Sequence, residues 1–408
     1  MKRKIINDPV HGFLSFPEKE VLTIIDHPCF QRLRNIMQMG VAHFVYPGAV
    51  HTRFLHSLGA CHLMGRALDE LKAKGFELSA QERTAARLAI LLHDVGHGPF
   101  SHALENSLLG GIGHETVSKV IIKKLNREQG GMLDTAEQVF DYSYPVKYLH
   151  QLVSGQLDVD RLDYLSRDSF YSGVSEGVIG CDRILKMLTI SNGELAVEEK
   201  GIYSIEKFII ARHIMYWQVY LHKTVLGAEL LLVNILKRAK ELYAAGEQLP
   251  ASPALTFFLQ QTISKQQLES EAEVIDQFCA LDDADMIIAV KSWAGAKDRI
   301  LATLCDMYLH RKLYKVIFDA ENEAVLLLQK KEEAQKKLGF TDAEMAYFVF
   351  SGTTSNNTYN ATDARINIAL KDGTVRDLAQ MQHSLVNDKV AQTVTKRYLC
   401  YWKGEAVS

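Results

Sequence analysis

Apolar residues return every three or four positions through most of the chain, from about residue 17 to residue 330. That spacing gathers apolar side chains on one face of an α-helix, whereas the alternation typical of strands is scarce in this part of the chain. The helical pattern is clearest in segments 83–93, 115–125, 204–222 and 224–241. We therefore predict a mainly α fold that contains long helices.

The pattern changes after a charged run near residue 330. Runs typical of strands follow at residues 346–352, 365–378 and 395–402. Asp372-Gly373 is typical of a hairpin turn, because both residues tolerate the positive φ that such turns need. The polar segment 351–360 is expected to be a loop. We expect a large helical domain over residues 1–330 and a small α+β lobe over residues 331–408.

Composition narrows the class of protein only slightly. The chain has 408 residues, 47% of them hydrophobic and 23% charged, and a net charge of -3. That balance is typical of a globular protein and gives no general attraction to nucleic acid or anionic membranes. The six cysteines are far apart in the sequence and form no CxxC pair, so we expect them to be reduced and buried. No long apolar run or signal-peptide pattern occurs, which predicts a cytoplasmic protein.

The most informative segment is ARLAILLHDVGHGPFSH at residues 86–102, where an apolar helical run leads to His93 and Asp94 just before glycines end the helix. An imidazole and a carboxylate are suitable ligands for a divalent ion, and the absence of cysteine argues against a structural zinc site. His56 and Asp160 lie in two further clusters rich in histidine or aspartate. Together the four residues would leave coordination positions open for water and substrate, as catalytic metals require.

Each candidate also has a purely structural interpretation. A lone histidine in a helical protein is more often a packed or surface residue than a ligand. The acidic segment 158–168 could be a solvated helix face, with Asp163 paired to Arg167 four residues later. The grouping of His93, Asp94 and two more histidines at the end of one apolar helix favours the metal site, because such polar density is costly for packing alone.

These segments resemble the HD superfamily, and closely its deoxynucleoside triphosphate triphosphohydrolases, which include the vertebrate sterile-alpha-motif HD enzyme and bacterial relatives. The resemblance rests on motifs in the same order along nearly the whole chain. They are KIINDPVHG at 4–12, DHPCFQRLRNIMQMG at 26–40, VYPGAVHTRFLHSLG at 45–59, LLHDVGHGPFSH at 91–102, GHE at 113–115, DVDRLDYLSRD at 158–168 and RKLYK at 311–315. It implies that the predicted helical domain is an HD phosphohydrolase core.

The resemblance also implies roles for individual residues. It makes His56, His93, Asp94 and Asp160 the metal ligands, with Mn²⁺, Fe²⁺, Mg²⁺, Ni²⁺ or Zn²⁺ all compatible. It places around the triphosphate Arg53, His97, His102, His114, Arg161, Tyr164 and Arg212. It places four residues at or near the sugar: Gln38, Asp168, Tyr216 and Tyr220. Tyr220 would exclude ribonucleotides. Water would attack the α-phosphorus, and either His102 or His114 would protonate the leaving 5′-oxygen.

A second set of matches concerns an activator. Lys4, Asp26, Gln31, Arg34, Arg311 and Lys315 agree with the guanine-nucleotide activator site that the family forms between subunits. A carboxylate suits the two donors on the guanine edge, and basic side chains suit phosphates. The resemblance therefore implies activation by GTP or dGTP and a homo-oligomer, a tetramer or a dimer. The alternative is that Asp26 and Arg34 are only helix-terminal charges.

Three positions depart from the vertebrate enzyme. Tyr216 replaces a phosphate-facing histidine, Leu221 replaces a glutamine near the base, and Arg161 replaces a lysine. Two other functions therefore stay open beside dNTP triphosphohydrolysis. One is an HD phosphohydrolase of other specificity, such as a nucleotide phosphatase or phosphodiesterase. The other is a nucleotide-sensing protein without turnover.

Overall fold

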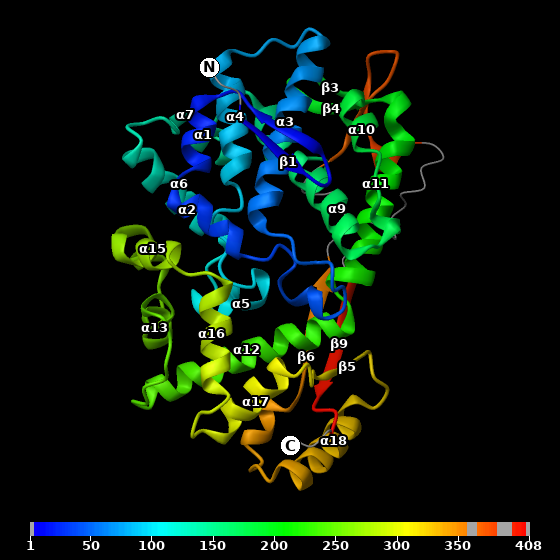
Figure 1. Ribbon diagram of the computed structural model, residues 1–408. Helices are drawn as coiled ribbons and strands as arrows, with labels where there is room; N and C mark the ends of the chain where they lie inside the picture. The colour runs from blue at the N-terminus through cyan, green and yellow to red at the C-terminus, as the bar shows by residue number, and fades with distance from the viewer. Residues whose placement is uncertain (1–3, 357–364, 382–393, 405–408) are drawn as a thin grey trace.

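A computed structural model describes residues 4–356, 365–381 and 394–404 of the chain. It is mainly α-helical, as predicted, with small sheets at three places (Figure 1). The helix α12 (Lys223–Ala244) runs between two groups of elements. On one side lie α3, α4 and α9, and on the other lies the sheet that contains β5, β6 and β9.

Three helices form the framework of the first group. The helix α3 (Arg53–Ala73) packs against both α4 (Ala80–Leu92) and α9 (Val159–Ser172). A capping box fixes the start of α4: the Ser79 side chain accepts from the Glu82 N–H, and the Glu82 side chain accepts from the Ser79 N–H. The helix ends at Leu92, so His93 caps it and Asp94 lies in the turn that follows.

The other helices surround this framework and α12. In the first half of the chain they are α1 (Lys19–Ile25), α2 (Pro28–Gln31), α5 (His102–Leu108), α6 (His114–Glu128), α7 (Asp134–Phe140) and α8 (Lys147–Val153). In the second half they are α10 (Cys181–Met187), α11 (Ile202–Met215), α13 (Pro253–Gln260), α14 (Lys265–Ser270), α15 (Ala272–Cys279), α16 (Asp283–Trp293), α17 (Arg299–Leu309) and α18 (Glu323–Leu338). The helices predicted over 83–93, 115–125 and 224–241 are confirmed.

The helix predicted over 204–222 is interrupted. It is α-helical only to Met215 and continues as a π-helical turn over Tyr216–Tyr220. The Leu221 N–H donates to the Tyr216 carbonyl at 2.7 Å, which is the i to i+5 bond of such a turn. Single π-turns are frequent at functional sites, and this one carries Tyr216 and Tyr220.

Three short strands lie between residues 17 and 330, and a hairpin precedes them. The strands β3 (Leu188–Ser191) and β4 (Glu194–Glu198) form a hairpin, and β5 (Lys315–Phe318) pairs with β9 (Val394–Tyr401). At the N-terminus, β1 (Lys4–Asp8) and β2 (Gly12–Phe16) form another hairpin. Strands are thus scarce between residues 17 and 330, as expected, because β3, β4 and β5 have four, five and four residues and β1 and β2 precede this range.

The C-terminal strands were predicted with one error. The strand β6 (Val349–Asn356) pairs with β9 along its whole length, so the loop expected at 351–360 is wrong up to residue 356, and its remaining residues lie outside the described part. The strands β7 (Asn367–Ala369) and β8 (Val375–Asp377) are antiparallel, and Gly373 has φ of 85° in the turn between them. The hairpin turn at Asp372-Gly373 is thus confirmed.

The division of the chain at residue 330 stays a prediction. That position lies inside α18, and the sheet β5-β9-β6 joins strands from both sides of it. The sheet β3-β4-β7-β8 does the same, because β4 pairs in parallel with β7.

Among the described residues, no helix on its own has the length and apolar character to cross a membrane. One bent pair, Glu199–Tyr220 with Lys223–Ala244, meets those two criteria when its halves are taken together.

Candidate metal centre and nucleotide site

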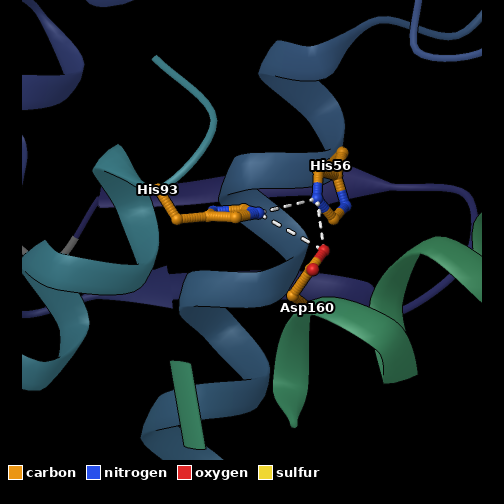
Figure 2. Close-up of side chains that lie close together, drawn as sticks. All are labelled: His56, His93 and Asp160. Carbon is orange, nitrogen blue, oxygen red and sulfur yellow. Dashed lines mark hydrogen bonds and ion pairs between the residues drawn. The ribbon is translucent and has the colours of Figure 1, made fainter. Parts of the chain in front are cut away.

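Three of the four predicted metal ligands, His56, His93 and Asp160, meet where α3, the end of α4 and the start of α9 converge (Figure 2). Asp160 Oδ1 lies 3.1 Å from His56 Nε2 and 3.3 Å from His93 Nε2. The two Nε2 atoms are 3.3 Å apart. Asp94 offers one oxygen to each histidine, at 3.3 Å from His93 and 3.6 Å from His56. Two imidazole nitrogens and the Asp160 carboxylate thus lie within 4.8 Å of one another, and Asp94 borders this group.

This donor set fits a divalent metal ion. His56 Nδ1 is 2.8 Å from Asp163 Oδ2, and His93 Nδ1 is 2.6 Å from the Ile90 carbonyl oxygen. Each Nδ1 therefore donates its proton to an oxygen, which leaves the Nε2 lone pairs for a metal. Nitrogen and oxygen donors without sulfur suit Mn²⁺, Fe²⁺, Mg²⁺, Ni²⁺ and Zn²⁺ to different degrees and do not select among them.

Charge balance in the pocket depends on the same contacts. Desolvation would lower the pKa of His56, but hydrogen bonds and charges from Asp160 and Asp163 raise it to about 10. Desolvation would likewise raise the pKa of Asp160, but the charge on His93 and hydrogen bonds to both histidines lower it. Without a metal, protons on the histidines balance the carboxylates. A bound cation would replace those protons.

A buried ion network behind His56 was not identified from the sequence as part of the site. Asp163 and Arg167 pair at 2.9 Å with side chains that are 0% exposed, so they are not the solvated helix face that was considered. Arg167 also binds Asp8 at 2.7 Å. His11 Nε2 lies 2.7 Å from Asp163 Oδ1. The turn of the β1–β2 hairpin therefore reaches the residue that orients a predicted metal ligand.

A second group of possible ligands lies beside the first. One ligand atom from each of Asp94, His97 and His114 lies within 4.8 Å of the others. The rings of His97 and His114 stack with centroids 3.9 Å apart, and Glu105 Oε1 lies 3.0 Å from His114 Nδ1. Asp94 lies in this second group and also contacts His93 and His56 of the first. His102 begins α5, but its side chain lies outside the described part of the structure.

Three predicted phosphate ligands are arginines held by neighbouring side chains. Arg53 donates to Asp94 Oδ2, and its Nε lies 2.7 Å from Ser101 Oγ. Arg161 pairs with Asp158, which also caps the start of α9. Arg212 donates to Gln156 Oε1 at 3.0 Å. The structure therefore ties Arg53 to the metal-ligand group and attaches the other two to the segment that leads into α9.

Three of the predicted sugar contacts, Asp168, Tyr216 and Tyr220, form a cluster that adjoins the predicted phosphate residues Tyr164 and Arg212. Asp168 is held on both oxygens, by His51 Nε2 at 2.7 Å and by the Tyr220 hydroxyl at 2.7 Å. The Tyr220 ring packs against both Tyr164 and Tyr216, with centroids 6.3 and 5.3 Å away. Gln38 Oε1 is buried and has no hydrogen-bond partner among the described residues. His51 is a further residue that the sequence did not single out for this site.

The predicted activator residues fall into two groups. Lys4 pairs with Asp26 at 2.9 Å, and Arg34 donates to Gln31 at 2.7 Å. Arg311 instead donates to the Phe44 carbonyl oxygen at 3.0 Å. In the described part of the chain, no hydrogen bond or ion pair joins Arg311 or Lys315 to the other four.

Arg311 and Lys315 line a cavity of about 730 Å³ beside α12, β5 and β9, referred to below as the basic cavity. Its other basic side chains are Lys223, Lys312, Lys396 and Lys403, and its aromatic ones include Trp217, Phe318 and Trp402. None of the described residues that line it is acidic. Lys396 Nζ lies 4.0 Å from the centre of the Trp217 ring.

Two protein families match segments of this chain. The HD domain family model matches residues 53–168, and the HD associated region matches residues 179–248. The first match begins at the start of α3 and contains all four predicted metal ligands. The second contains α11, the π-turn and all of α12.

Three similar proteins extend over different shares of the chain. A phosphohydrolase from Bacteroides thetaiotaomicron with a crystal structure is 46% identical, with a TM-score of 0.92 over 98% of this chain and 100% of its own. The YwfO protein of Bacillus subtilis is 30% identical over 98% of this chain and 93% of its own. The deoxynucleoside triphosphate triphosphohydrolase SAMHD1 homolog of Dictyostelium discoideum is 33% identical over 60% of this chain and 51% of its own. The chain spans about half of that last relative.

HD domains bind divalent metals, and this chain has His and Asp groups that could hold one. The similarity to the Bacteroides phosphohydrolase and to YwfO extends over nearly the whole chain. The chain belongs to the HD-domain family of metal-dependent phosphohydrolases.

Proposed function

We propose that this protein hydrolyses deoxynucleoside triphosphates to a deoxynucleoside and inorganic triphosphate, and that GTP or dGTP activates it. The observation that carries the proposal is the direct connection between the metal-ligand group and the cationic side chains that surround it. Arg53 donates to Asp94, and Arg161 follows Asp160 on α9. Three arginines, Arg212 included, supply more positive charge than a single phosphate group needs.

The metal ion would polarise the reacting phosphoryl group and lower the pKa of an attacking water. The side chains of the protein would do the rest. Arg53, Arg161 and Arg212 would bind phosphate oxygens and stabilise the charge that grows in the transition state. Their present partners Asp94, Asp158 and Gln156 hold the guanidinium groups before substrate arrives. Such preorganisation avoids reordering during the reaction.

The leaving 5′-oxygen needs a proton, and His102 and His114 are the two candidates. Support for His114 comes from Glu105, which lies 3.0 Å from its Nδ1, and from the His97 ring stacked on it. An imidazole fixed in this way can hold a proton at a defined position. The choice between His102 and His114 stays open.

The preference for deoxyribose would come from the Tyr220 cluster. The hydrogen bond to Asp168 fixes the Tyr220 hydroxyl, so its ring has little freedom to move away from a ribose 2′-hydroxyl. Asp168 can still accept from a sugar hydroxyl, because each carboxylate oxygen has two lone pairs. The buried Oε1 of Gln38 needs a donor and would accept from the substrate.

Activation would depend on two copies of the chain. The Lys4–Asp26 pair and the Gln31–Arg34 pair would recognise the guanine and part of the triphosphate of GTP. Arg311 and Lys315, from the basic cavity of another subunit, would bind the remaining phosphates. This arrangement accounts for the two separate groups within one chain and makes a homo-oligomer, a tetramer or a dimer, the active form.

Product analysis tests the proposal. Metal-loaded protein is incubated with each of the four dNTPs, with and without GTP, and the products are separated by ion exchange. We expect deoxynucleoside and inorganic triphosphate in equal amounts, with faster release when GTP is present. The four substrates are needed because Leu221 gives no basis for predicting the preferred base.

Two other outcomes would each replace the proposal. Orthophosphate or a nucleoside monophosphate as product would indicate an HD phosphohydrolase of other specificity. Tight nucleotide binding with no product, in the presence of every metal in the compatible set, would indicate a nucleotide sensor.

A further inference from the structure

Two of the six cysteines, far apart in the sequence, meet in the fold. Cys29 is in α2 and Cys279 ends α15, 250 residues later, and their Sγ atoms lie 2.7 Å apart. Cys29 is buried, whereas Cys279 is partly exposed. The sulfur atoms need to approach by less than about 1 Å to reach the covalent S–S distance of about 2.0 Å. No other cysteine pair in the described part of the chain makes such a contact.

Two basic groups and one acidic group lie near this pair. Arg32 follows α2 directly, and its guanidinium lies 4.9 Å from the centre of the Phe278 ring, next to Cys279. The hydrogen bond with Cys29 lowers the pKa of Cys279, and the charges on Arg32 and Lys124 lower it further against desolvation and the charge on Asp276. The same hydrogen bond and burial raise the pKa of Cys29. The exposed member of the pair is therefore the better nucleophile, because thiolates react and thiols do not.

We propose that Cys29 and Cys279 form a reversible disulfide that joins α2 to α15 beside the turn after α4 that carries His93 and Asp94, called here the metal-ligand turn. The inference rests on the position of the two sulfur atoms and on the accessibility of one of them. It does not depend on which phosphate ester the protein hydrolyses. The oxidant belongs to the class of low-molecular-weight disulfides.

The reaction is a pair of thiol–disulfide exchanges. The Cys279 thiolate attacks one sulfur of the small disulfide, forms a mixed disulfide and displaces one small thiolate. Cys29 then loses its proton and attacks the Cys279 sulfur, which forms the protein disulfide and displaces the second small thiolate. Two electrons pass from the protein sulfurs to the small disulfide, and two small thiols result. Reduction by excess small thiol reverses both steps.

Residues next to the cysteine pair contact the metal-ligand turn. The Arg32 guanidinium donates to the carbonyl oxygens of Val95 and His97, at 2.8 and 2.9 Å. It also donates to the Leu281 carbonyl oxygen at 3.0 Å. A Cβ built on Gly98 would lie 3.5 Å from the Phe278 ring, so that ring already contacts the same turn. A covalent bond from α2 to α15 would hold both contacts in place.

Thiol counting and peptide mapping test the proposal on the full-length protein. Folded, reduced protein is incubated with oxidised glutathione, and free thiols are then blocked and counted after denaturation. We expect the count to fall from six to four, since two of the six cysteines are consumed. Digestion without reductant should release one peptide pair that joins Cys29 to Cys279. The amide hydrogen of His97 should exchange more slowly in the oxidised protein.

Variants identify the order of the two steps. Cys29→Ser should leave glutathione attached to Cys279, because no second thiol can displace it. In the Cys279→Ser variant, position 279 cannot bind glutathione and Cys29 should stay a free thiol. Cys181→Ser is the matched control, since Cys181 is also partly exposed but contacts no cysteine in the described part of the chain. That variant should still lose two thiols.

Three results would overturn the inference. They are an unchanged count of six thiols in the oxidised wild-type protein, a disulfide between any other pair of cysteines, or a stable glutathione adduct on wild-type Cys279. The wild-type measurement decides the matter even where a serine variant does not fold. Unchanged exchange at the His97 amide would overturn the connection to the metal-ligand turn.

Discussion

The metal-ligand pocket and the basic cavity balance their charges in opposite ways. In the pocket, each histidine and arginine has a carboxylate or carbonyl partner from the same chain, such as Asp163 for His56 and Asp94 for Arg53. In the basic cavity, six basic side chains face a volume of about 730 Å³ whose described lining residues include no acid. The pocket is organised before any ligand binds. The cavity is suited to an anion that comes from outside the chain.

This difference in charge balance indicates what each site can do. Buried and paired groups hold a fixed geometry, which chemistry on a phosphate needs, but pairing leaves them little capacity to respond. Six cations that line one cavity repel one another, even though Lys312 pairs with Asp306 at 3.3 Å, and a polyanion relieves that repulsion on binding. We therefore expect changes in the pocket to affect chemistry and metal binding, and changes in the basic cavity to affect activation alone.

The largest effect is expected from Asp94→Ala. Asp94 contacts both predicted ligand histidines and Arg53, so its loss removes a metal ligand and frees an arginine. Hydrolysis should fall to background while GTP binding, measured by calorimetry, remains. The control is Asp182→Ala, which removes an exposed carboxylate paired with Arg66 at 2.9 Å. Unchanged turnover in Asp94→Ala would exclude the pocket as the catalytic centre.

The next effect is expected from His11→Ala. His11 contacts Asp163, which orients His56, so its loss should weaken metal binding by roughly 10- to 100-fold. A merely structural residue would not change metal affinity selectively. His11→Gln should restore part of the affinity, because the glutamine amide can still donate to Asp163. His310→Ala, at an exposed histidine, is the control. Equal metal affinity in all three variants would contradict the role of His11.

Metal affinity should also depend on pH. The pKa of His56 is raised to about 10, so below that pH the metal-free protein carries a proton on His56. A metal binds neutral imidazole and must displace that proton, so affinity rises with pH by about 10-fold per unit for each proton released. Titrations between about pH 6 and pH 8, in buffers of different ionisation enthalpy, measure the release. Affinity that is constant or falls over this range would contradict the assigned charges.

A smaller effect is expected in the basic cavity. Lys315→Ala should raise the GTP concentration needed for half-maximal activation by about 10-fold, the effect of losing one charge-assisted hydrogen bond. The rate without GTP should not change. Lys297→Ala removes an exposed lysine elsewhere and serves as the control. A fall in the rate without GTP, with the GTP concentration for half-maximal activation unchanged, would contradict the claim that the basic cavity acts only in activation.

The smallest effect is expected from Ser79→Ala. The substitution removes the cap of α4, the helix that leads to His93, and should lower the free energy of unfolding by about 1 kcal/mol. Because the cap lies at the opposite end of α4 from His93, metal affinity should not change. Denaturant titration with and without metal measures both quantities. A loss of metal affinity larger than the loss of stability would show that the pocket is less rigid than we infer.

The four metal ligands could be proposed from the sequence because two are adjacent and the other two lie in dense polar clusters. The network behind them could not. The Asp163–Arg167 pair was recognised, but a helical spacing does not show whether a pair is buried. It is buried because Gly59 of α3 leaves room, since a Cβ there would lie 1.9 Å from Asp163 Oδ1. The third partner, His11, is 152 residues away from Asp163 in the sequence.

The missed strands have different causes. Ser, Thr and Asn dominate residues 351–356 and indicate a loop, but pairing with β9 in the fold overrides that local preference. The β3–β4 hairpin carried a recognisable signal. Asn192 and Gly193 have φ of 53° and 76°, as in the tight turns that Asn-Gly favours, so this dipeptide could have indicated the hairpin.

The position of bond cleavage tests the central claim most directly. Metal-loaded protein is given a dNTP and GTP in ¹⁸O-labelled water, and the products are analysed by mass spectrometry. Attack on the α-phosphorus places one labelled oxygen in inorganic triphosphate and none in the deoxynucleoside, which is the result we predict. Label in orthophosphate, in pyrophosphate or in the deoxynucleoside would contradict the account.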